Sequence, residues 1–482
     1  MDMEGQRLSA KVLDRYARPD EARLDAMLKE ELDKARIKIV VLDDDPTGVQ
    51  TVHDVSVYTE LSRESIRQGF LEDKRLFYIL TNSRSFTTGQ TIAVHEKLAR
   101  DIAKVAAEEQ IPYMVMSRSD STLRGHYPAE TETLRRGMKA CGGPSADGEI
   151  ICPFFKEGGR YTLEDVHYVR YGDELVPAAD TEFARDATFG YHFSRIPYYV
   201  EEKTKGRYRA EEVTSISLER LRSMDVDGIV RQLTAVRDFN KVVVNAADYC
   251  DLKVFAIALY RAVAAGKHFI FRTAASLVKV MGGIPDRPLL TRDELILEES
   301  PFGGIVVVGS HTQKTTAQLE ELLTLKTVEG ISFHSDLVLE GEETFYAEVD
   351  RVVRESERIM RTGRTAVCFT SRKLLTRKED SKEEALLRSV RISDGVQALV
   401  GRLKLRPSFV VAKGGITSSD VGTKALKVKR ADVIGQIRPG IPVWRTGGES
   451  RSPKIPYVIF PGNVGEKGTL KEVVQILTGQ DC

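Results

Sequence analysis

Three consecutive aspartates are the strongest chemical signal in this sequence. Asp43, Asp44 and Asp45 directly follow an apolar run at residues 37–42 (IKIVVL) and precede the turn at 46–48 (PTG). Like charges this close repel one another, so such groups usually hold a metal ion or remove a proton. A Thr-Gly turn suits a loop that approaches a ligand closely. These residues therefore predict a chemical site at the end of a buried strand.

The elements around the aspartates alternate between strands and helices. Short apolar runs occur at residues 37–42, 75–80, 113–117 and 149–154, and helical segments such as 87–109 separate them. This alternation predicts βαβ units and a mostly parallel sheet. Ligands bind at the carboxyl ends of the strands in open parallel sheets. The residues that follow each run are therefore the candidate site.

Arginines accompany the acids at these predicted strand ends. Residues 81–84 (TNSR), 117–125 (SRSDSTLRG) and 156–160 (KEGGR) follow the next three runs. An arginine guanidinium fits a carboxylate or a phosphate in bidentate fashion. The set suits an anionic small molecule, although a single arginine more often caps a helix or pairs with a surface acid. The arginines concerned are Arg84, Arg118, Arg124 and Arg160.

The domain organisation follows from a change in composition. Residues 282–302 are rich in glycine, proline and charge, and a second strand–helix alternation begins after them. We predict two α/β domains with mostly parallel sheets and an active-site cleft between the domains. The expected divisions are a helical appendage at 1–36, with Leu24, Leu28 and Leu32 at intervals of four, a first domain at 37–290 and a second at 300–482.

Glycine-rich loops follow the apolar runs of the second domain. They lie at residues 309–312 (GSHT), 413–418 (KGGITS) and 462–465 (GNVG). Glycine lets the backbone approach a ligand, and the amides at helix starts attract anions. Together the loops fit a cradle for nucleotide phosphates, although a single glycine after a strand usually marks only a turn. No GxxxxGK[ST] motif and no GxGxxG after a strand is present.

Composition narrows the class of protein. The 482 residues include 71 basic and 71 acidic side chains, and this balance argues against nucleic acid or a membrane surface as the main partner. No apolar run reaches the roughly 20 residues of a transmembrane helix, and the charged N-terminus does not resemble a signal peptide. Five scattered cysteines indicate reduced thiols. We expect a cytoplasmic protein, and the sequence leaves monomer and homodimer both open.

These motifs resemble those of the four-carbon acid sugar kinase family, formerly known as a domain of unknown function. The resemblance implies an N-terminal domain that binds a sugar acid and a C-terminal domain that binds a nucleotide. It implies ATP- and Mg²⁺-dependent phosphorylation of the terminal hydroxyl of a four-carbon acid such as threonate, erythronate or 3-oxo-tetronate. The segments that carry the resemblance are 43–48, 81–84, 120–125 (DSTLRG, the most specific), 153–160, 309–310, 414–418 and 462–465.

The family resemblance also implies roles for individual residues. Asp44 and Asp45 match the acidic pair of the family and are the implied catalytic residues. The residues implied to bind the sugar acid are Arg84, Asp120, Ser121, Arg124 and Arg160. The residues implied to bind ATP are Ser310, Gly414, Gly415, Thr417, Gly462 and Asn463. The ligands of the metal are left open.

Several positions depart from the family pattern. Asp43 and Pro46 replace a small and an apolar residue, and Asn82 stands where the family usually has aspartate. His126 takes the place of an asparagine, and Ile416 replaces the acid of the G-G-[DE]-T-S loop. We expect the activity of the family, but its list of substrates need not transfer.

Two other functions fit parts of the sequence. Residues 43–47 (DDDPT) match the first motif of a HAD-type phosphatase, in which Asp43 would be the nucleophile and Asp45 the acid/base. This interpretation leaves the second domain unexplained. Such a phosphatase also needs a downstream acidic pair to bind Mg²⁺, and the only candidates in the sequence are Asp248 and Asp251. The second alternative is a sensor that binds a sugar acid without turnover, and ATP consumption distinguishes the kinase from it.

Overall fold

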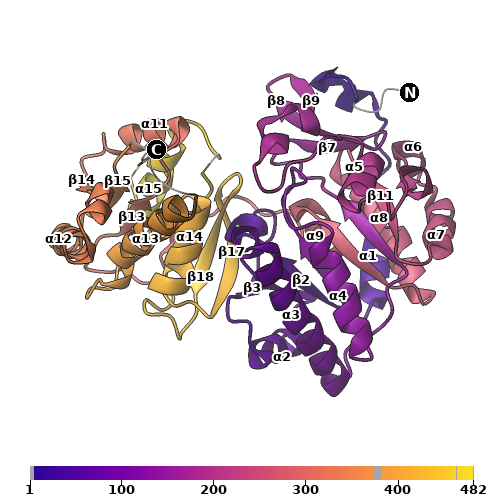
Figure 1. The fold of residues 1–482 in the computed structure, drawn as a ribbon, viewed down its shortest axis with the longest axis horizontal. Coiled ribbons are helices and arrows are strands. Elements are labelled where there is room, and N and C mark those ends of the chain that lie inside the picture. The colour runs from indigo at the N-terminus through magenta and orange to yellow at the C-terminus, as the bar shows by residue number, and fades with distance from the viewer. Residues whose placement is uncertain (1–4, 373–374, 376–381, 463, 481–482) are drawn as a thin grey trace. The chain divides into compact units, whose positions relative to one another are not determined.

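The computed structural model describes residues 5–372, 375, 382–462 and 464–480. The chain divides into two compact units (Figure 1). Unit 1 contains the chain up to Gly48 together with Glu60–Asp286, and unit 2 contains Val49–Thr59 together with the chain from Arg287 onward. Each unit is an α/β structure built on a mostly parallel sheet, which confirms the predicted pair of α/β domains. The excursion at Val49–Thr59 places a strand from the first half of the chain in unit 2.

The main sheet of unit 1 is parallel at every described pairing. Strand β2 is buried along its whole length because helices cover both faces of the sheet. The strands, in order across the sheet, are β10 (Thr214–Ile216), β11 (Asn240–Val244), β6 (Gly148–Cys152), β12 (Phe269–Thr273), β5 (Tyr113–Arg118), β2 (Lys38–Asp43) and β4 (Leu76–Leu80).

Two helical layers enclose this sheet. One layer contains α2 (Arg63–Leu71), α3 (Thr88–Glu109) and α4 (Ala129–Ala140), which lie side by side in Figure 1. The other layer contains α1 (Glu21–Lys34), α6 (Leu218–Arg222), α7 (Val226–Ala235), α8 (Tyr249–Ala264) and α9 (Ala275–Gly282). Further helical segments of unit 1 are η1 (Ala10–Arg15), η3 (Ser83–Ser85), η4 (Ala178–Asp180), η5 (Glu182–Arg185), α5 (Ile196–Lys203) and η6 (Ala210–Glu212). The turn η2 (Pro46–Val49) ends at the first residue of unit 2.

Helix α1 shows how local sequence determines an element. The side chain of Asp20 caps its first turn by accepting a hydrogen bond from the backbone N–H of Arg23. Leu24, Leu28 and Leu32 are buried, as their spacing of four predicts, and the helix packs on α8. The segment before it contributes β1 (Leu8–Ser9) to a small antiparallel sheet, in the order β1, β9 (Glu174–Pro177), β8 (Val166–Tyr171) and β7 (Arg160–Leu163).

The sheet of unit 2 has a parallel half and an antiparallel half. Strands β14, β15, β13, β16 and β19 pair in parallel, whereas β18, β17 and β3 extend the sheet in antiparallel fashion. The order is β3 (Val55–Tyr58), β17 (Arg430–Arg438), β18 (Ile441–Thr446), β19 (Pro456–Phe460), β16 (Val410–Lys413), β13 (Ile305–Val308), β15 (Thr365–Thr370) and β14 (Val328–Phe333).

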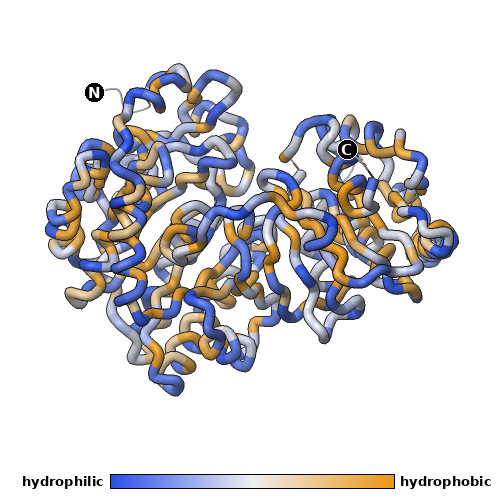
Figure 2. Tube along the Cα trace, turned by 180° about the vertical axis from the view of Figure 1, so that it is seen from behind, coloured by the Kyte–Doolittle hydropathy of each residue, from blue (hydrophilic) through white to orange (hydrophobic). Residues whose placement is uncertain are grey.

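Helices again form two groups around the sheet of unit 2. One group contains α10 (Arg292–Leu295), α11 (Gln313–Leu322) and α15 (Thr469–Thr478). The other contains η7 (Ser335–Leu339), α12 (Glu342–Met360), α13 (Lys382–Gly401), α14 (Gly415–Asp420) and the π-helical turn η8 (Val421–Ala425). Hydrophobic stretches concentrate in the interior of each unit (Figure 2). None of the helices formed by the described residues is both long and apolar enough to cross a membrane.

Candidate functional site

The carboxyl ends of β4, β2, β5 and β12 lie side by side at one edge of the unit 1 sheet. Asp43, the last residue of β2, is in register with Leu80 of β4 and with Arg118 of β5, and Arg118 is in register with Thr273 of β12. Because these strands are parallel, the loops that follow them share one edge. We call the side chains of Asp43, Asp44, Asp45, Arg84, Arg118, Asp120, Arg124 and Arg160 the unit 1 site.

Arg84 is the centre of this site and contacts three acids. Its Nη2 and Nε atoms lie 2.7 Å and 3.1 Å from the two carboxylate oxygens of Asp44. Its Nη1 lies 3.3 Å from Oδ2 of Asp45 and 3.7 Å from Oδ1 of Asp120. Nη1 of Arg118 lies 3.6 Å from Oδ1 of Asp44. The predicted acids and arginines therefore come together, but as partners of one another.

The carboxyl groups of the site differ in their pKa values. Burial raises the pKa of Asp44 in spite of the neighbouring guanidinium groups of Arg84 and Arg118. Burial acts in the same sense on Asp45, but Arg84 and hydrogen bonds from Thr47 outweigh it, so the pKa of Asp45 is lowered. Asp45 is also the more accessible of the two, with a side chain 16% exposed against 3% for Asp44. The arrangement therefore favours Asp45 as the ionised, reachable carboxylate.

Asp43 is enclosed by the turn that follows it. Its exposure is 2%, and a Cβ atom placed on Gly48 would meet its Oδ2 atom at 1.9 Å. The turn therefore needs glycine for space. Burial, opposed by Arg118 and assisted by the charges of Asp44 and Asp45, raises the pKa of Asp43 to about 7. A carboxyl group that is enclosed and easily protonated is poorly suited to the nucleophile role of the phosphatase alternative.

Arg124 is also paired with acids. Its Nε and Nη2 atoms lie 3.1 Å and 3.2 Å from the carboxylate of Asp120, and its Nη1 lies 3.7 Å from Oδ2 of Asp186. Its guanidinium is 5.0 Å from the ring centroid of Phe183. Burial raises the pKa of Asp120, but the charges of Arg84 and Arg124 outweigh it and hold that pKa well below its usual range. Asp120 is therefore a fixed negative charge.

Arg160 differs from the other arginines of the site. It begins β7, its Nη1 donates to the backbone carbonyl of Gly158, and its guanidinium is 5.5 Å from the ring centroid of Phe183. Its Nε is buried without a hydrogen-bond partner. Within the described part of the chain, no carboxylate forms an ion pair with Arg160. Its fork is therefore the one best placed to receive an anionic ligand.

Three supporting residues were not singled out from the sequence. The carboxylate of Glu130 accepts from the hydroxyls of Ser83 and Ser119 at 3.0 Å and 3.3 Å. Nη2 of Arg272 donates to the carbonyl groups of residues 123 and 124 at 3.1 Å and 2.9 Å. Nε2 of His167 lies 2.7 Å from the carbonyl oxygen of Ser121, whose side chain is half-buried. Arg272 and His167 thus hold the DSTLRG loop, whereas Glu130 joins the segments that follow β4 and β5, and only the burial of these residues in the folded chain reveals their roles.

The acids of the site do not form a ready metal centre. Among the described residues, no group of three or more histidine, cysteine, aspartate and glutamate side chains is arranged to hold a metal ion. The carboxylates of Asp44, Asp45 and Asp120 face guanidinium groups instead. A Mg²⁺ ion commonly binds through one or two carboxylates and the phosphates of a substrate, so the phosphates of a nucleotide would have to supply most of its ligands.

Three loops converge at the carboxyl edge of the unit 2 sheet. Thr315 Oγ1 lies within hydrogen-bond distance of Ser310 Oγ, at 3.2 Å, and of the carbonyl oxygen of Gly462, at 3.4 Å. A Cβ atom on Gly414 would lie 3.4 Å from both Ser310 Cβ and Thr417 Oγ1. We call Ser310, Gly414, Gly415, Thr417 and Gly462 the unit 2 site. The predicted residues of this loop group are thus neighbours, except Asn463, which lies outside the described residues.

Two residues adjacent to this site in sequence, Ile416 and Lys413, differ sharply in exposure. Ile416, at the position where the resembled family usually has an acid, is 69% exposed in the first turn of α14. Lys413, the residue before the two glycines, is completely buried at the end of β16. The sequence places Lys413 in the loop, but its burial is visible only in the structure.

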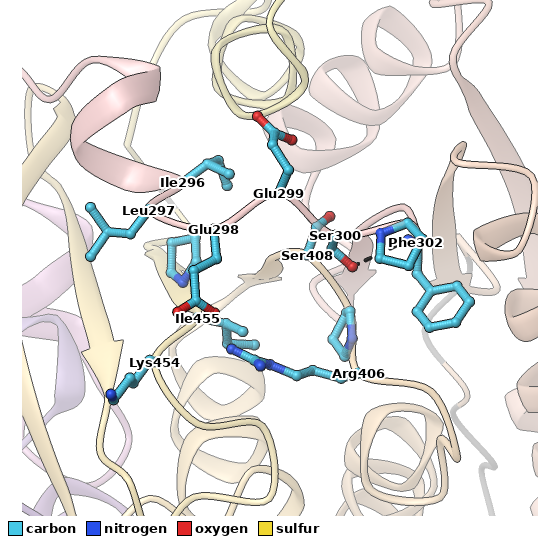
Figure 3. A pocket seen from close by; sticks show the side chains of 13 residues that line it. Ile296, Leu297, Glu298, Glu299, Ser300, Phe302, Arg406, Ser408, Lys454 and Ile455 are labelled. Atoms are coloured by element: carbon cyan, nitrogen blue, oxygen red, sulfur yellow. Dashed lines mark hydrogen bonds between the residues drawn. The ribbon is translucent and has the colours of Figure 1, made fainter.

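A cavity of about 220 Å³ lies at the opposite edge of the unit 2 sheet (Figure 3). It is lined by residues that precede β13, β16 and β19, among them Leu297, Arg406 and Lys454. Because those strands are parallel, this edge carries their amino ends. The cavity is therefore separate from the unit 2 site.

Comparison with protein families defines the class of the two halves. One family model, described as a sugar-binding N-terminal domain, matches residues 39–281, and a second, described as a nucleotide-binding C-terminal domain, matches residues 305–470. The chain is thus a two-domain protein that combines a sugar-binding and a nucleotide-binding domain. It belongs to the four-carbon acid sugar kinase family. No functionally curated protein shows significant similarity to it.

Solved structures share this fold across nearly the whole chain. The Haemophilus influenzae protein HI1011, of the DUF1537 family, is 14% identical with a TM-score of 0.61, covering 91% of this chain and 100% of its own. A Salmonella typhimurium LT2 protein, described as a candidate tRNA synthase, is 16% identical with a TM-score of 0.62, covering 90% of this chain and 98% of its own. At these identities the likeness concerns the fold alone.

Proposed function

We propose that this protein transfers the γ-phosphate of ATP to the terminal hydroxyl of a short polyhydroxy acid, with a four-carbon acid of the threonate, erythronate or 3-oxo-tetronate type as substrate. The family membership supports a kinase in general. The observation that carries the finer proposal is the unit 1 site, where buried, paired acids lie in one site with Arg160, whose guanidinium has no acidic partner in the described chain. Such a site offers both a carboxylate for a hydroxyl group and a cation for an acid.

The proposed roles follow from accessibility. Arg160 binds the carboxylate of the substrate, because it is the arginine without an acidic partner in the described chain. Asp45 accepts a hydrogen bond from the attacking hydroxyl and orients it, since phosphoryl transfer depends mainly on positioning and charge neutralisation. Asp44 and Asp120 hold Arg84, which keeps positive charge beside the reacting groups.

The nucleotide is assigned to unit 2. Ser310, Thr417 and the glycine-bearing loops at 414–415 and 462 form a small, polar surface that a phosphate chain can approach closely. Mg²⁺, bound mainly by the phosphates, would neutralise their charge. A cytoplasmic location, with a sugar acid and ATP as the small-molecule partners, is part of this proposal.

The test is release of ADP from ATP and Mg²⁺ in the presence of a panel of C3 to C6 sugar acids, with a control that lacks an acceptor. We expect turnover with one or two four-carbon acids and little in the control. ATP-independent release of phosphate from phosphorylated acids would replace the kinase by a phosphatase. Binding of acids and nucleotide without any turnover would leave the sensor.

A second test addresses Asp45. Asp45→Asn should abolish turnover while leaving the unfolding transition in urea in place, because the amide is nearly isosteric but cannot act as an anionic acceptor. Turnover close to that of the wild type would remove Asp45 from the mechanism.

A further inference from the structure

Unit 2 contains a buried lysine that the proposed function does not yet use. Lys413 ends β16 and has an exposure of 0%. Its Nζ donates to the carbonyl oxygens of Pro461 at 2.7 Å and Gly462 at 3.2 Å, and lies 4.0 Å from the ring centroid of Phe460. Within the residues that the structure describes, no carboxylate forms an ion pair with Lys413. Its amino group is therefore held by two carbonyl dipoles and an aromatic ring, and by no acid of the described chain.

The charged groups on neighbouring elements do not balance this lysine. Lys314 of α11 is a like charge. Asp420 of α14 is already 3.2 Å from the ammonium of Lys424, and Arg372, after β15, is a second cation, whose guanidinium donates to carbonyl groups. Burial, with a smaller contribution from Lys314, lowers the pKa of Lys413 to about 7. A buried charge without an opposite partner is costly, so the empty site favours the neutral amine.

The described loops at this edge of the sheet supply no negative charge that balances Lys413. His311 and Glu466, which lie on two of them, have exposed side chains. Ile416 is apolar where the resembled family usually has an acid, so this position supplies no negative charge either. The missing partner of Lys413 is thus an anion that the described chain does not provide.

We propose that Lys413 is a positioning residue for a polyphosphate ligand of unit 2, and that it takes up a proton when this ligand binds. The inference rests on the proposed function, since the polyphosphate is that of the nucleotide. Lys413 acts through Gly462, whose carbonyl oxygen it shares with Thr315 Oγ1, itself hydrogen-bonded to Ser310. Protonation of Lys413 therefore fixes the loop and supplies positive charge, and a nearby anion in turn favours the protonated amine.

The first measurement uses the wild-type protein and ADP, so that no turnover occurs. Titration calorimetry at pH 8, in phosphate-free buffers of different ionisation enthalpy, reports the protons bound with the ligand. The terminal phosphate of ADP is already ionised there, since its second pKa is about 6. We expect uptake approaching one proton per ADP, and an association constant that falls about tenfold per pH unit above pH 7.5.

Variants of Lys413 test whether this residue takes up the proton when ADP binds. Lys413→Met should lose both the proton uptake and the pH dependence and bind ADP more weakly. Lys413→Arg, which stays charged, should lose the pH dependence but bind more tightly than Lys413→Met. The matched control is Lys454→Met, since Lys454 is exposed at the amino end of neighbouring β19, beside the cavity of Figure 3. This control should behave as the wild type.

Three results would overturn the inference, and those that spare the proposed function can be told apart from the one that does not. Binding of ADP without proton uptake in the wild type, or with undiminished uptake in Lys413→Met, removes the role of Lys413 and leaves the proposed kinase standing. Absence of any binding of ADP or ATP removes the nucleotide site, and with it both the inference and the proposed function.

Discussion

Arg84 and Asp44 form a two-point ion pair, with Nη2 and Nε of the guanidinium at 2.7 Å and 3.1 Å from the two carboxylate oxygens. Asp44 is almost fully buried. Burial lowers the pKa of Arg84, but the charges of Asp44, Asp45 and Asp120 outweigh it and raise that pKa. Arg84 therefore stays protonated and determines how three acids are arranged.

The first prediction concerns the loss of this arginine. Arg84→Ala leaves the buried charge of Asp44 without its main partner, so the free energy of unfolding should fall by about 3–5 kcal/mol in urea denaturation. The matched control is Arg63→Ala, which removes an ion pair with Glu108 whose side chains are 42% and 43% exposed. That variant should lose at most about 1 kcal/mol. Equal losses in the two variants would contradict the central role of Arg84.

The second prediction concerns the turn around Asp43. In Gly48→Ala the new Cβ would overlap Oδ2 of Asp43, which is 1.9 Å from its position, so the turn or the carboxylate must move. We expect a loss of about 1–3 kcal/mol in unfolding free energy, together with lower turnover. Gly89→Ala is the control, because its Cβ meets nothing within 4 Å in helix α3. It should be neutral or stabilising by up to about 1 kcal/mol.

Much of the unit 1 site could be predicted from sequence because parallel strands impose a simple rule. Asp43–Asp45, Thr81–Arg84 and Ser119–Gly125 all follow apolar runs, and β2, β4 and β5 are neighbours in the sheet. The pairing of acids with arginines was not predictable, because it depends on side-chain directions over sequence separations as large as the 75 residues between Arg118 and Asp43.

The antiparallel strands of unit 2 could not be predicted from the alternation of strands and helices. Strand β17 has buried residues at every second position, the period of a strand with one buried face, but it lies beside the antiparallel strands β18 and β3 and not in a βαβ unit. Strand β3 pairs with β17 across more than 370 residues. Strands whose stability depends on such distant partners cannot be assigned to a sheet position from local sequence.

The third prediction concerns pH. The pKa of Asp43 is raised to about 7 in the folded chain by burial, against an ordinary value near 4 when unfolded. The folded state therefore binds this proton more tightly, and the stability that the proton provides is lost as pH rises from about 4 to 7. Compared with Asp43→Asn, which cannot ionise, the wild type should lose up to about 1.4 kcal/mol of unfolding free energy per pH unit in this window.

The comparison with Asp43→Asn also cancels the effect of other titratable groups on the free energy of unfolding. Buried His167 has a pKa lowered to about 4, so its effect in the same window has the opposite sign, with stability lost as pH falls. Because His167 is present in both proteins, its contribution cancels in the difference. Urea denaturation at intervals from pH 4 to pH 8 measures that difference. A difference that is constant across the range would show that Asp43 is ionised throughout.

The last prediction separates Arg160 from the paired arginines. Arg160→Met removes the one guanidinium of the site that has no acidic partner in the described chain, so no buried acid is left uncompensated. We expect KM for the sugar acid to rise about 10- to 100-fold, the value of one charged hydrogen-bonded contact, with little change in kcat. Arg170→Met, on the adjacent strand β8 with an exposed side chain, is the control and should leave both constants unchanged. A fall in kcat with KM unaltered would mean that Arg160 serves the transferred phosphate and not the carboxylate of the substrate.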